Sequence, residues 1–214
     1  MSRERPFDRP ALALGLLAAQ AAFTLTFRGP RPRFWQRMTL TGLSLGGFAL
    51  AVSPESRRLQ IRGRDVALGL ASAATLYVTF QVGDRFARRF VPGGERQIRD
   101  IYALRELRPK PEIGARLLAV IGPAEEIFWR GFVQATFARI LGRWRGAAAG
   151  AAAYGGVHLV TGNFTLLGAA GVAGAHWAAL YALGMPLGAL IVSHAAWDVW
   201  IFLLQPTIGD DEAG

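Results

Sequence analysis

Two adjacent glutamates and an arginine lie inside an apolar run that extends from about residue 113 to 141. A helix of about 20 residues crosses a bilayer, and a charge at that depth costs about 3 kcal/mol on insertion scales, so such charges mark candidate functional sites. Glu126 and Arg130 are four residues apart and share a helix face, where they can form an ion pair. Glu125 points about 100° away from Glu126 and has no such partner. We therefore assign chemistry to Glu125 and architecture to the pair; the alternative is an ion-pair cluster that only holds helices together.

Two more polar pairs occur at four-residue spacing in later apolar runs, Tyr154 with His158 and His194 with Asp198. Each pair presents to one helix face. A carboxylate and imidazoles that meet in a dry cavity suit water activation, because the carboxylate can take a proton from water and an imidazole can hold that water or stabilise an oxyanion. These roles predict hydrolysis of a peptide bond inside a membrane. The chain has no cysteine and no serine in an elbow motif, so a nucleophilic triad is not expected.

The composition is that of a membrane protein, with 52% hydrophobic residues among 214 and a mean hydropathy of +0.27. The net charge is +9, but the basic residues form short clusters between apolar runs instead of one stripe. We therefore expect membrane lipids with anionic headgroups, and not nucleic acid, to be the partners of these clusters. The absence of cysteine excludes disulfides and thiolate metal sites.

Apolar runs separated by basic loops predict an all-α fold, a polytopic transmembrane bundle of about seven spans. The runs are residues 10–27, 38–53, 66–82, 112–140, 146–161, 164–183 and 187–204. Gly146 and Gly150 give the fifth run a small-residue face on which another helix can pack closely. We divide this single membrane domain into N-terminal helices and basic loops (1–98), a catalytic core (99–204) and an acidic tail (205–214) that we expect to be loose.

A long polar segment, residues 83–112, separates the third and fourth runs. Ile101, Leu104 and Leu107 recur within it at three-residue spacing, which predicts a short amphipathic helix over residues 99–109 on the membrane surface. With antiparallel neighbouring spans, the polar residues of the fourth, fifth and seventh runs reach similar depth on the side of this segment. The topology therefore predicts that they converge on one site.

Three motifs in order carry a resemblance to a known family. They are Glu125-Glu126-x-x-x-Arg130, Tyr154-x-x-x-His158 and His194-x-x-x-Asp198. Their order and spacing resemble the CPBP family of intramembrane proteases, the CaaX-protease and bacteriocin-processing family that is also called Abi or type II CaaX prenyl endopeptidases. The resemblance covers about residues 100–204, and the amphipathic stretch before the fourth run also resembles family members.

The resemblance implies a role for each motif residue. Glu125 would be the general base that activates water, with His158 assisting, and His194 with Asp198 would form the oxyanion site. Glu126 and Arg130, the structural pair, would hold the first motif in shape. The implied activity is that of a membrane-embedded endopeptidase.

Two positions depart from the usual family pattern. Tyr154 stands where the family usually has Phe, which adds a hydroxyl and keeps the ring. Asp198 stands where eukaryotic members usually have Asn, as it does in many bacterial relatives. An ionised aspartate accepts hydrogen bonds but cannot donate one. Asp198 is therefore either protonated, or it orients His194 and favours the charged ring.

The residues also allow other readings. Glu125, His158 and His194 contain two histidines and a carboxylate, an accepted zinc set, and the family has been described both as metalloproteases and as metal-free glutamate proteases. The chain lacks the HExxH spacing, so we prefer a reaction that requires no cofactor. Buried carboxylates and histidines also build proton relays, which makes a transporter a further alternative, and a catalytically idle scaffold is another.

We expect the substrate to be a peptide or protein with a hydrophobic or lipidated C-terminal segment. The high content of Arg, Ala and Gly indicates a GC-rich bacterial source, and hence a multi-pass protein of the bacterial inner membrane. Bacterial substrates would be peptides, bacteriocin precursors or the anchoring tails of membrane and sorted proteins. His176 matches no motif, and we interpret it as a packing or supporting residue.

Overall fold

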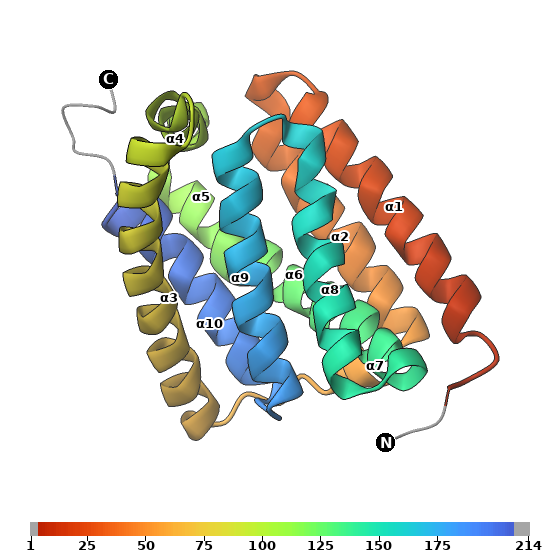
Figure 1. Cartoon of the computed structure of the whole chain (residues 1–214). Helices are drawn as coiled ribbons and strands as arrows, with labels where there is room; N and C mark the ends of the chain where they lie inside the picture. The colour runs from red at the N-terminus through yellow and green to blue at the C-terminus, as the bar shows by residue number, and fades with distance from the viewer. Residues whose placement is uncertain (1–3, 208–214) are drawn as a thin grey trace.

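The structure is a computed structural model that describes residues 4–207, and helices account for most of this range, with no strand in it. The all-α prediction is therefore confirmed for the described residues. Figure 1 shows the long helices side by side in one bundle, with their axes roughly along its length. Residues 208–214, which include the acidic residues of the predicted loose tail, lie outside the described residues, as do residues 1–3.

Three helices form the N-terminal part of the bundle: α1 (Asp8–Arg28), α2 (Phe34–Val52) and α3 (Gly63–Phe90). Helices α1 and α2 pack as an antiparallel pair, and α3 lies on the other side of the bundle, against α10 (Leu187–Val199). The first two predicted runs coincide with α1 and α2. The third helix is longer than predicted and continues to Phe90, well into the segment that the sequence marks as polar.

The fourth run forms one long helix that is interrupted twice. Helices α5 (Lys110–Arg116), α6 (Gly122–Phe128) and α7 (Ala135–Leu141) follow one another through π-helical turns at Leu117–Ile121 and Trp129–Gln134. Pro123 accounts for the first interruption, because proline has no N–H to donate and its ring clashes with the carbonyl four residues earlier. A π turn inside a helix is frequent at functional sites, and these two flank the glutamate pair.

The C-terminal part consists of α8 (Arg143–Val157), α9 (Phe164–Ala182) and α10, which ends in a third π-helical segment at Trp200–Leu204. Helix α8 packs against α7 through the predicted small-residue face. A Cβ added to Gly146 would lie 2.5 Å from the backbone of Ala138, and one added to Gly150 would lie 3.0 Å from Gln134 Cβ. The close-packing prediction is confirmed, with the preceding helix as the partner.

The amphipathic helix was predicted over residues 99–109, and those boundaries are wrong. Helix α4 is Gly94–Tyr102, and a 3-10 turn at Ala103–Leu107 follows it. The helix starts at the glycines after Pro92, and Pro109 disfavours helical backbone at the residue before it. Its buried face is formed by Ile98 and Tyr102, one turn apart, instead of the later leucines.

Within residues 4–207, four helices are long and apolar enough to cross a membrane: Asp8–Arg28, Gly63–Phe90, Phe164–Ala182 and Leu187–Leu204. All seven predicted runs are helical, but this criterion of length and composition supports four of them. The exact number of crossings therefore stays a prediction.

Candidate active site

Helix α6 carries both glutamates and is held tightly between two neighbours. A Cβ added to Gly46 of α2 would lie 3.1 Å from Ala124 Cβ, and one added to Gly122 would lie 3.0 Å from Ala195 Cα of α10. The backbones of α2, α6 and α10 can approach this closely because glycine has no side chain at these contacts. The close contact fixes α6 against the helix that carries the third motif.

The ion pair predicted from the spacing is present and fully buried. Arg130 Nη1 donates to Glu126 Oε1 over 2.9 Å, and the two side chains are 1% and 0% exposed. Arg130 Nη2 also donates to the carbonyl of Gly174, over 3.2 Å. The other partner of Glu126 was not predicted: His194 Nδ1 lies 2.7 Å from the same Oε1 atom. The structural pair is thus a triad that joins the first motif to the third.

The imidazole of His194 lies between three carboxylates. Glu126 is a hydrogen-bond acceptor, so Nδ1 must carry the proton of that bond. On the other edge of the ring, Nε2 lies 3.9 Å from Glu125 Oε2 and 3.6 Å from Asp198 Oδ2. These separations exceed a direct hydrogen bond and are of the size that a group bound between them would bridge. Asp198 thus lies beside the catalytic candidates, as the spacing predicts.

His158 presents a free ring nitrogen. Its Nδ1 lies 2.9 Å from the backbone carbonyl of Tyr154, one turn earlier. A carbonyl only accepts, so Nδ1 is the protonated nitrogen, and Nε2 of the neutral ring carries a lone pair. Phe23 of α1 contacts the ring edge-on, with centroids 5.2 Å apart, and only 7% of His158 is exposed.

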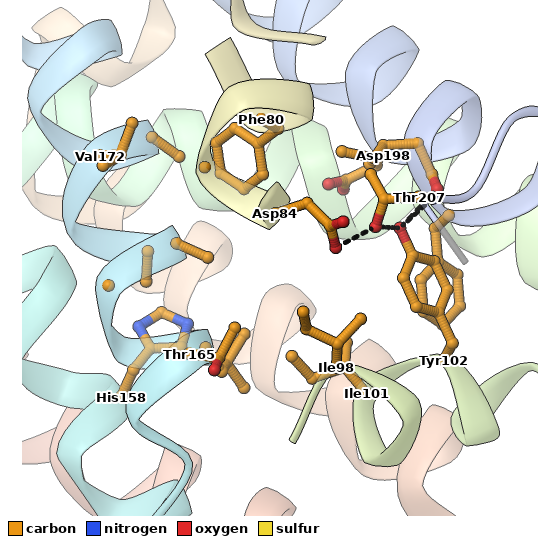
Figure 2. Close-up of a pocket in the computed structure, with 18 of the residues that line it drawn as sticks. Phe80, Asp84, Ile98, Ile101, Tyr102, His158, Thr165, Val172, Asp198 and Thr207 are labelled. Atoms are coloured by element: carbon orange, nitrogen blue, oxygen red, sulfur yellow. Dashed lines mark hydrogen bonds between the residues drawn. The ribbon is translucent and has the colours of Figure 1, made fainter. Parts of the chain in front are cut away.

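A cavity of about 690 Å³ connects these groups and is lined mostly by apolar side chains. Five motif residues line it, namely Glu125, Tyr154, His158, His194 and Asp198, whereas the two structural residues of the first motif are not among its lining residues. Figure 2 shows His158 and Asp198 on facing sides of this space. The three motifs therefore meet at one cavity, as predicted. The two adjacent glutamates differ in their position: Glu125 faces the cavity and Glu126 does not.

Helix α4 and the end of α10 form the rim of the cavity. Thr207 Oγ1 donates to Asp84 Oδ1 over 2.8 Å, and the Thr207 amide donates to the Tyr102 hydroxyl over 3.2 Å. Tyr102 in turn donates to the carbonyl of Ile201 over 3.1 Å, and Figure 2 shows this group of contacts beside the cavity. Burial raises the pKa of the Tyr102 hydroxyl, although its bonds with Thr207 oppose that effect, so the hydroxyl stays a neutral donor. The polar segment predicted as a surface anchor thus also closes one side of the site.

Trp177 of α9 contacts all three motifs, a role that its place in an apolar run did not predict. Its ring stacks on that of His194, with centroids 4.0 Å apart and an angle of 18°. It lies edge-on to Tyr154 at 6.5 Å, and the Arg130 guanidinium lies 5.3 Å from its centroid. The side chain is fully buried. The available signal was its place next to His176, the polar residue of an otherwise apolar run.

The aromatic residues of the first motif are packing residues. Phe128, Trp129 and the nearby Phe132 are all at most 2% exposed. Trp129 lies edge-on to Tyr154, with centroids 5.5 Å apart, so it supports the second motif from the side of α6.

The zinc alternative requires Glu125, His158 and His194 to point at one metal ion. Among residues 4–207, no group of three or more His, Asp or Glu side chains is arranged to hold a metal ion. His194 uses Nδ1 for Glu126, and Asp198 is nearer to its Nε2 than Glu125 is. As they lie here, Glu125, His158 and His194 do not form a metal site, and the zinc alternative stays a prediction.

Residues 112–200 match the family model described as Type II CAAX prenyl endopeptidase Rce1-like. The matched segment begins at the start of the long α5–α7 helix and ends in α10, so it contains all three motifs. No curated protein and no solved structure matches the chain.

Proposed function

We propose that this multi-pass chain hydrolyses a peptide bond near the membrane surface with water activated by Glu125. The premise is the match of residues 112–200 to the Rce1-like type II CAAX prenyl endopeptidase family, which makes the chain a membrane peptidase. The observation that carries the proposal is the different environment of two adjacent carboxylates. Oε1 of Glu126 is engaged by both Arg130 and His194, whereas Glu125 faces the cavity with no hydrogen bond shorter than 3.5 Å to a nitrogen of either histidine. A base must be free to reach the proton that it abstracts.

Glu125 is the proposed general base. It takes a proton from a water molecule in the cavity, and the oxygen of that water attacks the carbonyl carbon of the scissile bond. The lone pair on His158 Nε2 can accept a hydrogen bond from the same water and hold it in place. When the tetrahedral intermediate collapses, the protonated Glu125 gives the proton to the leaving amine, and the base is restored.

The oxyanion of the intermediate needs a donor, and His194 is our candidate. Its Nδ1 proton is committed to Glu126, so a donor at Nε2 requires the imidazolium form of the ring. Asp198 Oδ2 lies 3.6 Å from that nitrogen. This proximity supports Asp198 as a residue that orients and charges His194, and not as a second oxyanion donor, because an ionised aspartate has no proton to donate.

The cavity supports a substrate that enters with an apolar segment. Phe86 and Phe164 line it and are 59% and 68% exposed, so apolar surface continues from the cavity to the outside of the bundle. We propose a peptide or protein with a hydrophobic or lipidated C-terminal segment, reached from the surrounding lipid. We also propose that all seven helical runs cross the membrane. The membrane would be the bacterial inner membrane, as the content of Arg, Ala and Gly indicates.

The test is cleavage of a quenched peptide library with hydrophobic C-terminal segments by the purified protein in detergent. Glu125→Gln keeps the size of the side chain and removes the base, so it should abolish cleavage without loss of folded protein. Wild type after exhaustive chelation is compared in parallel. Cleavage that is lost on chelation and restored by zinc would replace the proposed mechanism by the metal-dependent one, and no cleavage of any peptide by wild type would overturn the proposal.

A further inference from the structure

Four polar side chains, beginning with Trp177 beside His194, form a continuous chain of hydrogen-bond contacts. Trp177 Nε1 donates to Ser193 Oγ over 3.0 Å, Ser193 Oγ lies 2.8 Å from Ser72 Oγ, and Ser72 Oγ lies 2.9 Å from His176 Nε2. The chain begins and ends on neighbouring residues of α9 and passes through α10 and α3. It therefore fastens three helices together at the level of the third motif.

The donors and acceptors in this chain can be arranged in one direction, from Trp177 to His176, in which each hydroxyl proton is donated to the next residue. The indole nitrogen only donates, so Ser193 Oγ is the acceptor of the first bond. Ser193 can then donate to Ser72, and Ser72 can donate to the lone pair of His176 Nε2. The reverse direction would leave the Ser193 proton without a partner in this chain. Buried hydroxyls that are fully satisfied in this way fix the groups that they join.

The position of Trp177 determines the position of the His194 ring. Glu126 holds one edge of the imidazole through the 2.7 Å contact with Nδ1, which fixes that edge but leaves the ring free to tilt. The indole lies against one face of the ring, 4.0 Å away and 18° from parallel, and this contact restrains the tilt. The direction of Nε2 toward Glu125 and Asp198 therefore depends on where the indole is held.

We propose that Ser72, Ser193 and Trp177 are positioning residues for the reaction, because their hydrogen bonds fix the plane of the His194 ring. This inference rests on the proposed function, in which His194 Nε2 faces the oxyanion. Ser72 lies in α3, outside the matched segment 112–200, so the N-terminal helices contribute to the geometry of the site. His176 is the last acceptor of the chain, which gives it a supporting role.

The first test separates positioning from general stability. Ser72→Ala removes the central hydroxyl, and Ser72→Thr keeps it. Thr41→Val is the matched control, because Thr41 and Thr26 form a buried hydroxyl pair of 2.9 Å between α1 and α2 that does not contact His194. We expect Ser72→Ala to lower kcat about 3- to 10-fold with KM unchanged, the fold-change that one neutral hydrogen bond carries. Ser72→Thr should recover most of the loss, and Thr41→Val should leave kcat unchanged.

The second test does not need a substrate. In protein labelled with ¹⁵N-tryptophan, Trp177→Phe identifies the indole N–H signal of Trp177. Ser193→Ala removes its acceptor and should shift this signal and speed its exchange with water, and Ser72→Ala should do so to a smaller extent, whereas Thr41→Val should not. The inference would be overturned if neither serine variant changed the shift or the exchange rate of the Trp177 indole N–H. An equal loss of kcat in Ser72→Ala and Thr41→Val would also overturn it. If wild type cleaves no peptide, the proposed function fails. The indole signal still decides whether the hydrogen bonds from Ser193 and Ser72 hold Trp177 in place.

Discussion

Glu126→Ala is the substitution that separates architecture from chemistry most sharply. It removes the carboxylate that pairs with Arg130. Among the described residues, this guanidinium, whose side chain is 1% exposed, then keeps the Gly174 carbonyl at 3.2 Å and the faces of two aromatic rings. Loss of one member of a buried ion pair costs about 3–5 kcal/mol, because the other charge stays buried without compensation. His194 loses its Nδ1 partner in the same variant. We expect the free energy of unfolding to fall by about 3–5 kcal/mol or more.

The assay is reversible unfolding in mixed micelles of mild detergent and sodium dodecyl sulfate, followed by circular dichroism. The matched control is Glu125→Ala, at the adjacent position on the same helix. Its nearest histidine nitrogen is 3.9 Å away, so it leaves no short ion pair broken. We expect it to destabilise the protein by about 1 kcal/mol, the centre of the distribution for single substitutions, while losing about 10²–10⁴-fold in activity, the contribution of a general base. Equal destabilisation by the two variants would refute the division of roles between the adjacent glutamates.

Three further predictions follow from individual contacts. Asp198→Asn should lower kcat by about 10-fold or more without unfolding the protein, because the amide keeps the size of the side chain but not the charge beside His194; wild-type kcat in a steady-state peptide assay would contradict the orienting role. Gly174→Ala should destabilise the protein by about 1–3 kcal/mol in the micelle assay, because the added Cβ would lie 2.8 Å from Tyr154 Cδ1. Burial raises the pKa of Glu55. A hydrogen bond from its own amide, the positive charge of Arg139 and a hydrogen bond from Ser53 together outweigh burial and hold the pKa below its usual value. Stability from Glu55 is then present above its unfolded-state pKa and is lost as the pH falls through the lowered value, so unfolding titrations below neutrality should show a loss that Glu55→Gln reduces.

The sequence predicted what depends on spacing along one helix. The four-residue interval between Glu126 and Arg130 is enough to predict their ion pair, because side chains at i and i+4 meet on the helix surface. The same rule places His158 one turn after Tyr154, where its Nδ1 meets the carbonyl of that residue. The apolar runs likewise predict the helices, because the length of an uninterrupted apolar stretch can be read directly from the sequence.

Contacts between helices could not be predicted in the same way. Nothing in the spacing says that His194 bonds to Glu126, because their distance depends on how α6 and α10 pack. Trp177 looks like an ordinary apolar residue until its neighbours are known. The end of α3 was also missed: Asp84 and Arg88 pair one turn apart, so a segment with polar composition continues as a helix.

The π-helical turn at Leu117–Ile121 has a consequence for the ancestry of the long helix. A π turn holds one residue more than the α-helical turn that it replaces, so it is equivalent to a single-residue insertion accommodated without breaking the helix. Deleting one residue there should restore regular winding and turn everything before it by about 100° relative to the glutamates. The apolar face of α5 would then point away from its present neighbours. Related chains that lack this residue would have to shift their hydrophobic pattern by one position, a frame change that alignments of such chains can reveal.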